Sequence, residues 1–230
     1  MKTNTETAAI FGGSSVSDVS FIRKICGLIY TVACDSGYYH FLKAECEPDS
    51  LVGDFDTLNQ SMIKTPGNII KLNPIKDDTD VFFAVKNLVS RGYKNIHLFG
   101  CLGQKIDHTI GNIQILSYLK DQGINSYLYT ADNENVLFIL NNEEFHFRLG
   151  SQGRISVFSL DNEAKGVDEK NLKYTLNNAV LSNSVPLGVS NEFIPQSPKE
   201  AVISVKEGKL LIFSPIDSLP ALYFLKNNNN

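Results

Sequence analysis

The first 131 residues alternate short apolar runs with helical segments, and this alternation restricts the chain to a small set of folds. Apolar runs that read as strands occupy residues 8–11, 28–34, 50–52, 68–72, 95–99 and 127–130. Helical segments are expected at about residues 18–26, 37–44, 81–90 and 108–120. Strands separated by helices in this way form a mostly parallel sheet with the helices packed against its faces. The sequence therefore predicts an α/β architecture for this part of the chain.

The third helical segment carries the clearest pattern. Val81, Ala84, Val85 and Leu88 follow the spacing i, i+3, i+4, i+7, which places them along one face of a helix. The Asp and Thr residues of segment 76–80 come directly before this stripe. Such side chains accept hydrogen bonds from the free N–H groups of a first helical turn, so we expect the helix to begin there.

After residue 133 the period changes from helical to strand-like. Short apolar runs at 136–140, 144–149, 154–160, 171–176, 201–205 and 210–213 are separated by turn-forming residues. No helical pattern stands out, which predicts a small antiparallel β-sandwich or partial barrel. We therefore expect an α/β domain at residues 1–133, an all-β domain at 134–226 and a disordered tail at 227–230.

Charge and cysteine content exclude several classes of protein. The net charge is −4 and the isoelectric point is about 5.6, which argues against nucleic acid as the main partner. The N-terminus lacks the apolar core of a signal peptide, and the longest apolar stretch near it is too short to span a membrane. Cys26, Cys34, Cys46 and Cys101 have no C-x-x-C spacing, so we expect reduced thiols, no zinc knuckle and a cytoplasmic protein with no membrane partner.

Aspartates follow successive strands of the predicted sheet. They are Asp35 after the second strand, Asp54 and Asp56 after the third, Asp77, Asp78 and Asp80 after the fourth, and Asp107 after the fifth. Any single one is readily explained as a turn former or helix cap. Open α/β sheets, however, bind ligands beyond the carboxyl ends of their strands, where these loops meet. So many carboxylates in one cleft repel one another unless a cation is present, and Mg²⁺ with substrate phosphates suits such ligands.

A glycine-containing loop, 100–105, follows the fifth strand and leads into a helix. Glycines let a phosphate approach the backbone, the helix N-terminus stabilises an anion, and Lys105 adds a positive charge. The loop is neither a P-loop nor a Rossmann fingerprint. His108 lies at the expected helix start and is a candidate phosphate or nucleotide contact. We expect structural roles for the three remaining histidines, His40, His97 and His146.

The ordered set of motifs resembles the thiamine pyrophosphokinase family. In the first domain they are Cys34-Asp35-Ser36-Gly37, Gly53-Asp54-Phe55-Asp56, Asp77-Asp78-Thr79-Asp80 and the segment 100–108. In the second domain they are Leu172-Lys173-Tyr174 and Gly188-Val189-Ser190-Asn191-Glu192. Any one motif is common, but their order and intervals are specific, and together they cover nearly the whole chain.

The chain departs from the family pattern at four positions. Ser36 stands where a second glycine is usual, and Tyr39 stands in place of an Asn. Lys105 replaces an Arg, which keeps the charge but loses the bidentate geometry toward phosphate. Asn171 replaces the Gly that opens the Leu-Lys-Tyr motif.

The resemblance implies transfer of a pyrophosphoryl group from ATP to the hydroxyl of thiamine, which gives thiamine diphosphate and AMP. It also implies a homodimer in which thiamine lies between the α/β domain of one subunit and the β domain of the other. Phosphoryl transfer depends on positioning and on neutralising charge at the phosphates, which is consistent with the aspartate pattern.

On this basis each candidate residue receives an expected role. We expect the catalytic residues to be Asp35, Asp54, Asp56, Asp80 and Asp107. The expected Mg²⁺ ligands are Asp54, Asp56 and Asp80. The expected ATP contacts are Lys76, Thr79, Asp80, Lys105, Asp107 and His108, and the expected thiamine contacts are Ser190 and Asn191. The general base remains open among Asp35, Asp54 and Asp107.

Two other functions use the same residues. A metal-dependent nucleotide phosphohydrolase would employ the same carboxylates and a placed water. A non-catalytic module that binds a nucleotide or thiamine is the other alternative, although an anionic nucleotide would need cations rather than many aspartates. Thiamine-dependent release of AMP distinguishes transfer from both.

Overall fold

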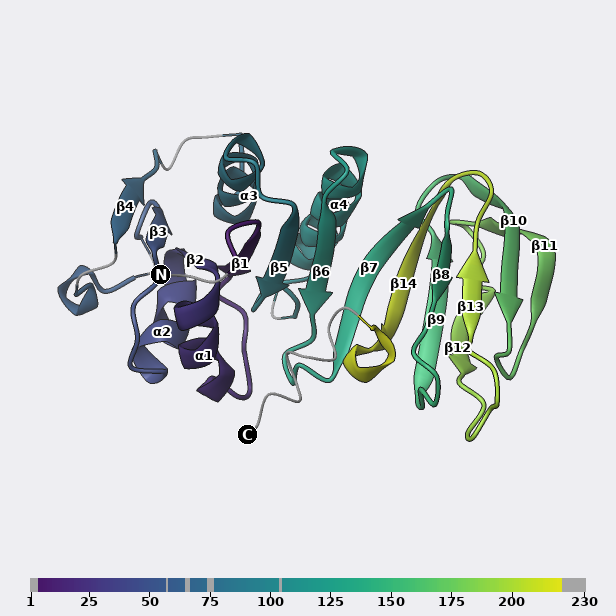
Figure 1. Cartoon of the computed structure of the whole chain (residues 1–230). Coiled ribbons are helices and arrows are strands. Elements are labelled where there is room, and N and C mark those ends of the chain that lie inside the picture. The colour runs from purple at the N-terminus through teal and green to yellow at the C-terminus, as the bar shows by residue number, and fades with distance from the viewer. Residues whose placement is uncertain (1–3, 57, 65–66, 74–76, 104, 221–230) are drawn as a thin grey trace. The chain divides into compact units, whose positions relative to one another are not determined.

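The computed structural model describes residues 4–56, 58–64, 67–73, 77–103 and 105–220 (Figure 1). Lys76 and the predicted tail 227–230 lie outside these residues. The chain divides into two compact units, Met1–Asn133 and Glu134–Asn230. Each is described in turn.

The first unit is a parallel sheet with helices. Its elements, in chain order, are β1 (Thr7–Phe11), α1 (Ser20–Leu28), β2 (Tyr30–Cys34), a 3-10 turn (Asp35–Gly37), α2 (Tyr38–Lys43), β3 (Ser50–Gly53), a second 3-10 turn (Gln60–Met62), β4 (Asn68–Lys71), α3 (Asp80–Ser90), β5 (Asn95–Phe99), α4 (Ile106–Asp121) and β6 (Asn125–Tyr129). Its strands lie in the order β6-β5-β1-β2-β3-β4, and every neighbouring pair is parallel. The predicted α/β fold class is confirmed.

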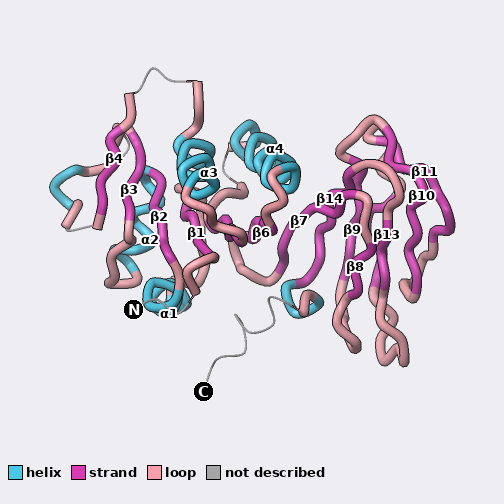
Figure 2. Tube along the Cα trace, turned by 45° about the horizontal axis from the view of Figure 1, so that its top comes forward, coloured by secondary structure: helices cyan, strands magenta, loops and turns pink. Residues whose placement is uncertain are grey.

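Helices cover both faces of this sheet. Figure 2 shows α3 and α4 on one face and α1 on the other, where α1 packs with α2. All five residues of β1 are buried, as expected for a central strand covered on both sides. The ring of Phe11 stacks on that of Phe99 at 5.1 Å and meets Phe41 edge-on at 4.9 Å. The centre of the core is therefore the pair β1 and β5.

The start of α3 confirms the predicted cap. Thr79 has an extended backbone, and its Oγ1 accepts a hydrogen bond from the N–H of Phe82 at 3.2 Å. Asp80 lies in the first turn, where a carboxylate is favoured by the helix dipole. Ala84, Val85 and Leu88 are buried, so the apolar stripe faces the sheet. No helix among the described residues is long and apolar enough to cross a membrane.

The second unit is all β apart from one 3-10 turn (Ile216–Ser218), as far as its described residues reach. Its strands are β7 (Asn135–Asn141), β8 (Glu144–His146), β9 (Arg154–Ser159), β10 (Glu163–Lys170), β11 (Leu176–Ser182), β12 (Gly188–Glu192), β13 (Val202–Ser204) and β14 (Lys209–Pro215). They form two antiparallel layers, β12-β9-β14-β7 and β11-β10-β13-β8. The rings of Phe138 on β7 and Phe145 on β8 lie 5.0 Å apart and join the layers. This confirms the predicted antiparallel sandwich.

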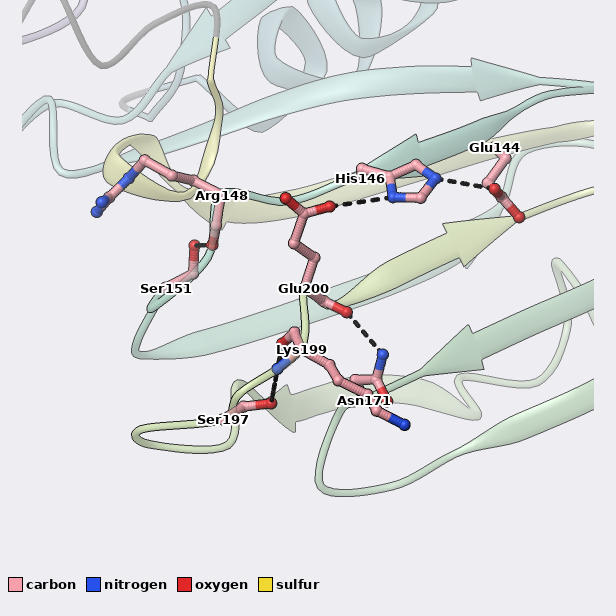
Figure 3. Close-up of polar contacts among 8 residues, drawn as sticks. All are labelled: Glu144, His146, Arg148, Ser151, Asn171, Ser197, Lys199 and Glu200. Atoms are coloured by element: carbon pink, nitrogen blue, oxygen red, sulfur yellow. Dashed lines mark hydrogen bonds and ion pairs between the residues drawn. The ribbon is translucent and has the colours of Figure 1, made fainter.

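The predicted strand at 171–176 is wrong. Asn171 has a φ of 57°, in the left-handed region, so the chain turns there instead of extending. Its side-chain Nδ2 donates to the carbonyl of Glu200 at 2.7 Å, which holds the turn in place (Figure 3). Asparagine tolerates this backbone conformation better than most residues, which explains how it can stand where the family has glycine.

Three strands of the second unit were not predicted, namely β10, β11 and β12. β10 reads Glu-Ala-Lys-Gly-Val-Asp-Glu-Lys, and its inward positions include a glycine and a glutamate rather than large apolar residues. β11 and β12 are largely exposed and polar. Their pairing partners stabilise these strands, and that contribution is invisible in the local sequence pattern.

Candidate active site

The strand order reverses between β1 and β5, and the loops that leave these two strands meet there. The N–H of Gly12 donates to the carbonyl of Phe99 at 2.8 Å, and that of Ser14 to the carbonyl of Gly100 at 2.8 Å. A Cβ on Gly12 would lie 2.6 Å from the carbonyl oxygen of Gly100, so the approach requires glycine. A crevice at such a reversal point is where doubly wound sheets bind ligands.

The side chain of His40 holds the loop that follows β1. Its Nε2 lies 3.2 Å from the carbonyl of Gly12 and 2.9 Å from that of Ser14, so it acts as the donor to both. Burial lowers the pKa of His40, which favours the neutral ring. The structural role expected for this histidine therefore consists in holding the loop that follows β1.

A cavity of about 610 Å³ opens at this point. Six of the predicted site residues line it: Asp35, Thr79, Asp80, Lys105, Asp107 and His108. They come from the end of β2 and from the N-terminal turns of α3 and α4. Gly12, Gly13 and Ser14 also line it, which the sequence analysis did not anticipate. The sequence signal for them was the Gly12-Gly13 pair directly after the first strand, because residues that follow parallel strands meet at one edge of the sheet.

Three carboxylates gather beside the strand ends. One oxygen from each of Asp35, Asp54 and Asp56 lies within 4.8 Å of the others. Close packing of two strand ends brings them together, because a Cβ on Gly53 would lie 3.2 Å from the Cα of Asp35. The N–H of Asp56 donates to Oδ1 of Asp54 at 3.2 Å, which closes the loop after β3. Carboxylate oxygens grouped in this way are ligands that a hard divalent cation could use.

The cluster differs from the predicted ligand set of Asp54, Asp56 and Asp80. Asp35 takes part, and Asp80 instead lines the cavity from the first turn of α3. The carbonyl of Asp80 accepts from the Sγ of Cys34 at 3.6 Å, which ties this helix start to the end of β2. Sequence spacing could not show which carboxylates form the cluster, because this depends on where each strand ends relative to its neighbours in the sheet.

The start of α4 and the loop before it also line the cavity. Lys105 caps α4, and Asn112, buried on that helix, donates through Nδ2 to the carbonyl of Cys101 at 2.7 Å. The Thr109 hydroxyl accepts from the N–H of Gly103 at 3.1 Å. These bonds fix the described residues of the loop after β5 against the start of α4. The N–H of His108 already donates to Oδ1 of Asp107 at 2.9 Å, so an anion at this helix start would meet Lys105 and the N–H groups of Ile106 and Asp107.

Asp78 and Cys101, which belong to the motifs described above, are not assigned to the binding of phosphate or metal. Asp78 forms an ion pair with Lys86 on the surface of α3. Cys101 also lines the cavity, but its buried thiol donates to the carbonyl of Phe99 at 3.2 Å, and burial raises its pKa to about 12, which argues against a role as nucleophile at neutral pH. The predicted ATP contact Lys76 lies outside the described residues.

An aromatic pair from α3 and α4 lines the cavity. The rings of Phe82 and Tyr118 meet edge-on at 5.1 Å, and both side chains line the cavity together with Val81 and Ile115. Sequence analysis missed these residues because apolar side chains on helices usually belong to the core. The result is a cavity with a charged end at the strand termini and an apolar end between two helices.

In the second unit, the two predicted thiamine contacts have different environments. Ser190 is exposed, has a φ of 60°, and donates its N–H to the Oγ of Ser156 at 3.0 Å. Asn191 is only 4% exposed, and its amide group is fully used in internal hydrogen bonds. Ser190 is therefore accessible to a ligand, whereas the amide of Asn191 is engaged within the protein, and the thiamine contacts of both residues stay predictions.

Comparison with known proteins matches both units to one family. Residues 27–128 match the model of the thiamin pyrophosphokinase catalytic domain, and residues 143–210 match that of the thiamin pyrophosphokinase vitamin B1 binding domain. A thiamine pyrophosphokinase of Bacillus subtilis is 26% identical over 168 residues, which are 71% of this chain and 78% of the relative. Thiamin pyrophosphokinase 1 of Caenorhabditis elegans is 24% identical over 198 residues, which are 80% and 78% of the two chains.

Solved structures show the same fold. The crystal structure of the Bacillus subtilis thiamine pyrophosphokinase superposes with a TM-score of 0.78 at 21% identity, covering 91% of this chain and 98% of that one. A thiamin pyrophosphokinase of Geobacillus thermodenitrificans gives 0.75 at 25% identity, with 92% and 98% covered. The yeast enzyme gives 0.75 at 14% identity, with 95% and 89% covered.

Proposed function

Because the chain belongs to the thiamine pyrophosphokinase family, we propose that it transfers the pyrophosphoryl group of ATP to the hydroxyl of thiamine. The products are thiamine diphosphate and AMP. The observation that carries this proposal is the juxtaposition of Asp35, Asp54 and Asp56 at the strand ends, where Asp35 also lines the cavity that the start of α4 lines. A triphosphate bound at that helix start would have its terminal phosphates at the carboxylate end.

ATP would bind through the two helix starts. Lys105, the N-cap residue of α4, would neutralise phosphate charge, and the backbone N–H groups of Ile106 and Asp107 would donate to phosphate oxygens. The Thr79 hydroxyl accepts from Phe82, which leaves its own proton to donate to the same ligand. The apolar end, with Phe82 and Tyr118, suits the base.

The carboxylate cluster fits Mg²⁺. Three negative groups this close repel one another strongly unless a cation lies among them, and carboxylate oxygens are the ligands that Mg²⁺ prefers. Asp35, Asp54 and Asp56 would hold the ion, with Asp80 at the nucleotide side of the cavity. Bound Mg²⁺ supplies charge neutralisation to the phosphates during transfer.

The reaction itself balances without further reagents. The thiamine hydroxyl oxygen forms a bond to the β-phosphorus of ATP, and the bond from that phosphorus to the oxygen bridging toward the α-phosphate breaks. AMP leaves with the bridging oxygen, and the hydroxyl proton passes to a carboxylate. Asp107 is our choice for that proton acceptor, since it lines the cavity and is not one of the three carboxylates that would hold the ion. The remaining residues orient the reactants.

We place the thiamine contacts on the second unit at Ser190. We also propose a homodimer, in which the β unit of one subunit supplies these contacts to the α/β unit of the other. Exposed apolar side chains near Ser190, namely Val185, Leu187 and Val189, support an interface there. Four free thiols support a cytoplasmic location.

The test follows the appearance of AMP from ATP in the presence of Mg²⁺, with and without thiamine. Transfer predicts AMP formation that requires thiamine and yields an equal amount of thiamine diphosphate. Equal AMP release without thiamine would support a phosphohydrolase instead. Tight ATP binding with no turnover under any condition would support a binding module.

A further inference from the structure

A glutamate is buried in the second unit. Glu169, on β10, is 2% exposed, and its register partners on the neighbouring strands are the apolar residues Leu176 and Ile203. Its Oε2 accepts from Nδ2 of Asn191 at 2.6 Å, and its buried Oε1 has no hydrogen-bond partner among the described residues. Burial raises the pKa of Glu169 to about 7. Burying an acid carries a free-energy cost, so a buried glutamate at this position indicates a specific role.

Asn191 uses all four hydrogen-bonding positions of its amide. Nδ2 donates to Glu169 and, at 2.7 Å, to the carbonyl of Tyr174. Oδ1 accepts from the N–H of Tyr174 at 3.0 Å and from that of Glu192 at 2.8 Å. A flipped amide would place its oxygen against Glu169 and against the Tyr174 carbonyl. Glu169 therefore helps to fix the orientation of the amide.

The amide in turn joins two parts of the surface. Tyr174 belongs to the segment after β10 and is 61% exposed, whereas Ser190 precedes Asn191 on β12. Asn171, at the other end of that segment, is anchored separately through the carbonyl of Glu200 (Figure 3). The bonds from Asn191 therefore determine where the Tyr174 end lies relative to Ser190.

We propose that Glu169 is a positioning residue for thiamine, which acts through Asn191 to hold the Tyr174 backbone and Ser190 in one fixed arrangement. This inference rests on the proposed function, in which Ser190 contacts thiamine. Glu169 itself is too deeply buried to touch a ligand. Its effect is therefore specific to thiamine and separate from the ATP cavity, whose residues belong to the first unit.

The first test compares Glu169→Leu with Glu169→Gln and with Glu163→Gln, an exposed control at the start of the same strand. Leu removes the acceptor, and we expect the KM for thiamine to rise about tenfold while the KM for ATP stays within about twofold. Glu169→Gln keeps an acceptor oxygen for Asn191, so its KM for thiamine should stay within about threefold of the wild-type value. An unchanged thiamine KM in a folded Glu169→Leu protein would overturn the proposal.

A second test does not depend on Glu169→Leu folding. Asn191→Asp places a carboxylate against Glu169 and should raise the thiamine KM. Glu169→Gln combined with Asn191→Asp allows the hydrogen bond to form in the reverse direction, so the double variant should bind thiamine better than Asn191→Asp alone. Purely additive effects would contradict the coupling. If the wild-type protein does not use thiamine at all, the proposed function fails; if it does and neither test shows a thiamine effect, only this inference fails.

Discussion

Replacing Glu169 with Gln should change how the stability of the protein depends on pH. Burial raises the pKa of this carboxyl to about 7 in the folded protein, against a usual value of 4.5. Between these two values the folded state holds a proton that the unfolded state has released. The contribution of Glu169 to stability is therefore fully present below pH 4.5 and is lost as the pH rises through 7.

The size of this effect follows from the shift in pKa. At about 1.4 kcal/mol per pH unit, the wild type should lose roughly 2–3 kcal/mol relative to Glu169→Gln between pH 5 and pH 8. Urea unfolding followed by circular dichroism at the two pH values measures the difference, with Glu163→Gln as the exposed control on the same strand. A free-energy difference between wild type and Glu169→Gln that is the same at both pH values would refute the assignment of a buried, protonated carboxyl.

Three further predictions concern the site and its support. Asp56→Asn removes one charge from the carboxylate cluster, so it should lower turnover at least about a hundredfold at saturating Mg²⁺ and leave the circular dichroism spectrum unchanged. Near-normal turnover at both saturating and limiting Mg²⁺ would show that Asp56 is not part of the site. Ser190→Ala should raise the KM for thiamine more than that for ATP, and steady-state kinetics with each substrate varied would show otherwise if Ser190 makes no contact. Gly37→Ala should destabilise the fold by at least about 1–3 kcal/mol, since its Cβ would lie 2.0 Å from the carbonyl oxygen of Phe11, whereas Gly27→Ala, with open space around it, should be neutral or stabilising by thermal unfolding.

Much of the first unit was predictable because its signals are local. The central strands are continuous apolar runs, and the residues that follow them are fixed to one edge of a parallel sheet. That rule correctly brought Asp35, Asp80 and Asp107 to one cavity. It could not decide that Asp35, rather than Asp80, would join Asp54, because this depends on the packing of Gly53 against the end of β2.

The second unit was less predictable for a physical reason. β10 places Gly166 and Glu169 inside, and the partner that makes Glu169 acceptable, Asn191, lies far along the chain. A pattern of apolar residues cannot identify such a strand. For the same reason, the sequence did not show that the amide of Asn191, a thiamine contact implied by the resemblance, makes four hydrogen bonds within the protein.

The fate of each phosphate of ATP tests the central proposal most directly. In the presence of Mg²⁺ and thiamine, label at the β-phosphate should appear in thiamine diphosphate, and label at the α-phosphate should remain in AMP. Without thiamine, neither product should form. Label from the β-phosphate recovered as free pyrophosphate or phosphate at the same rate with and without thiamine would contradict transfer.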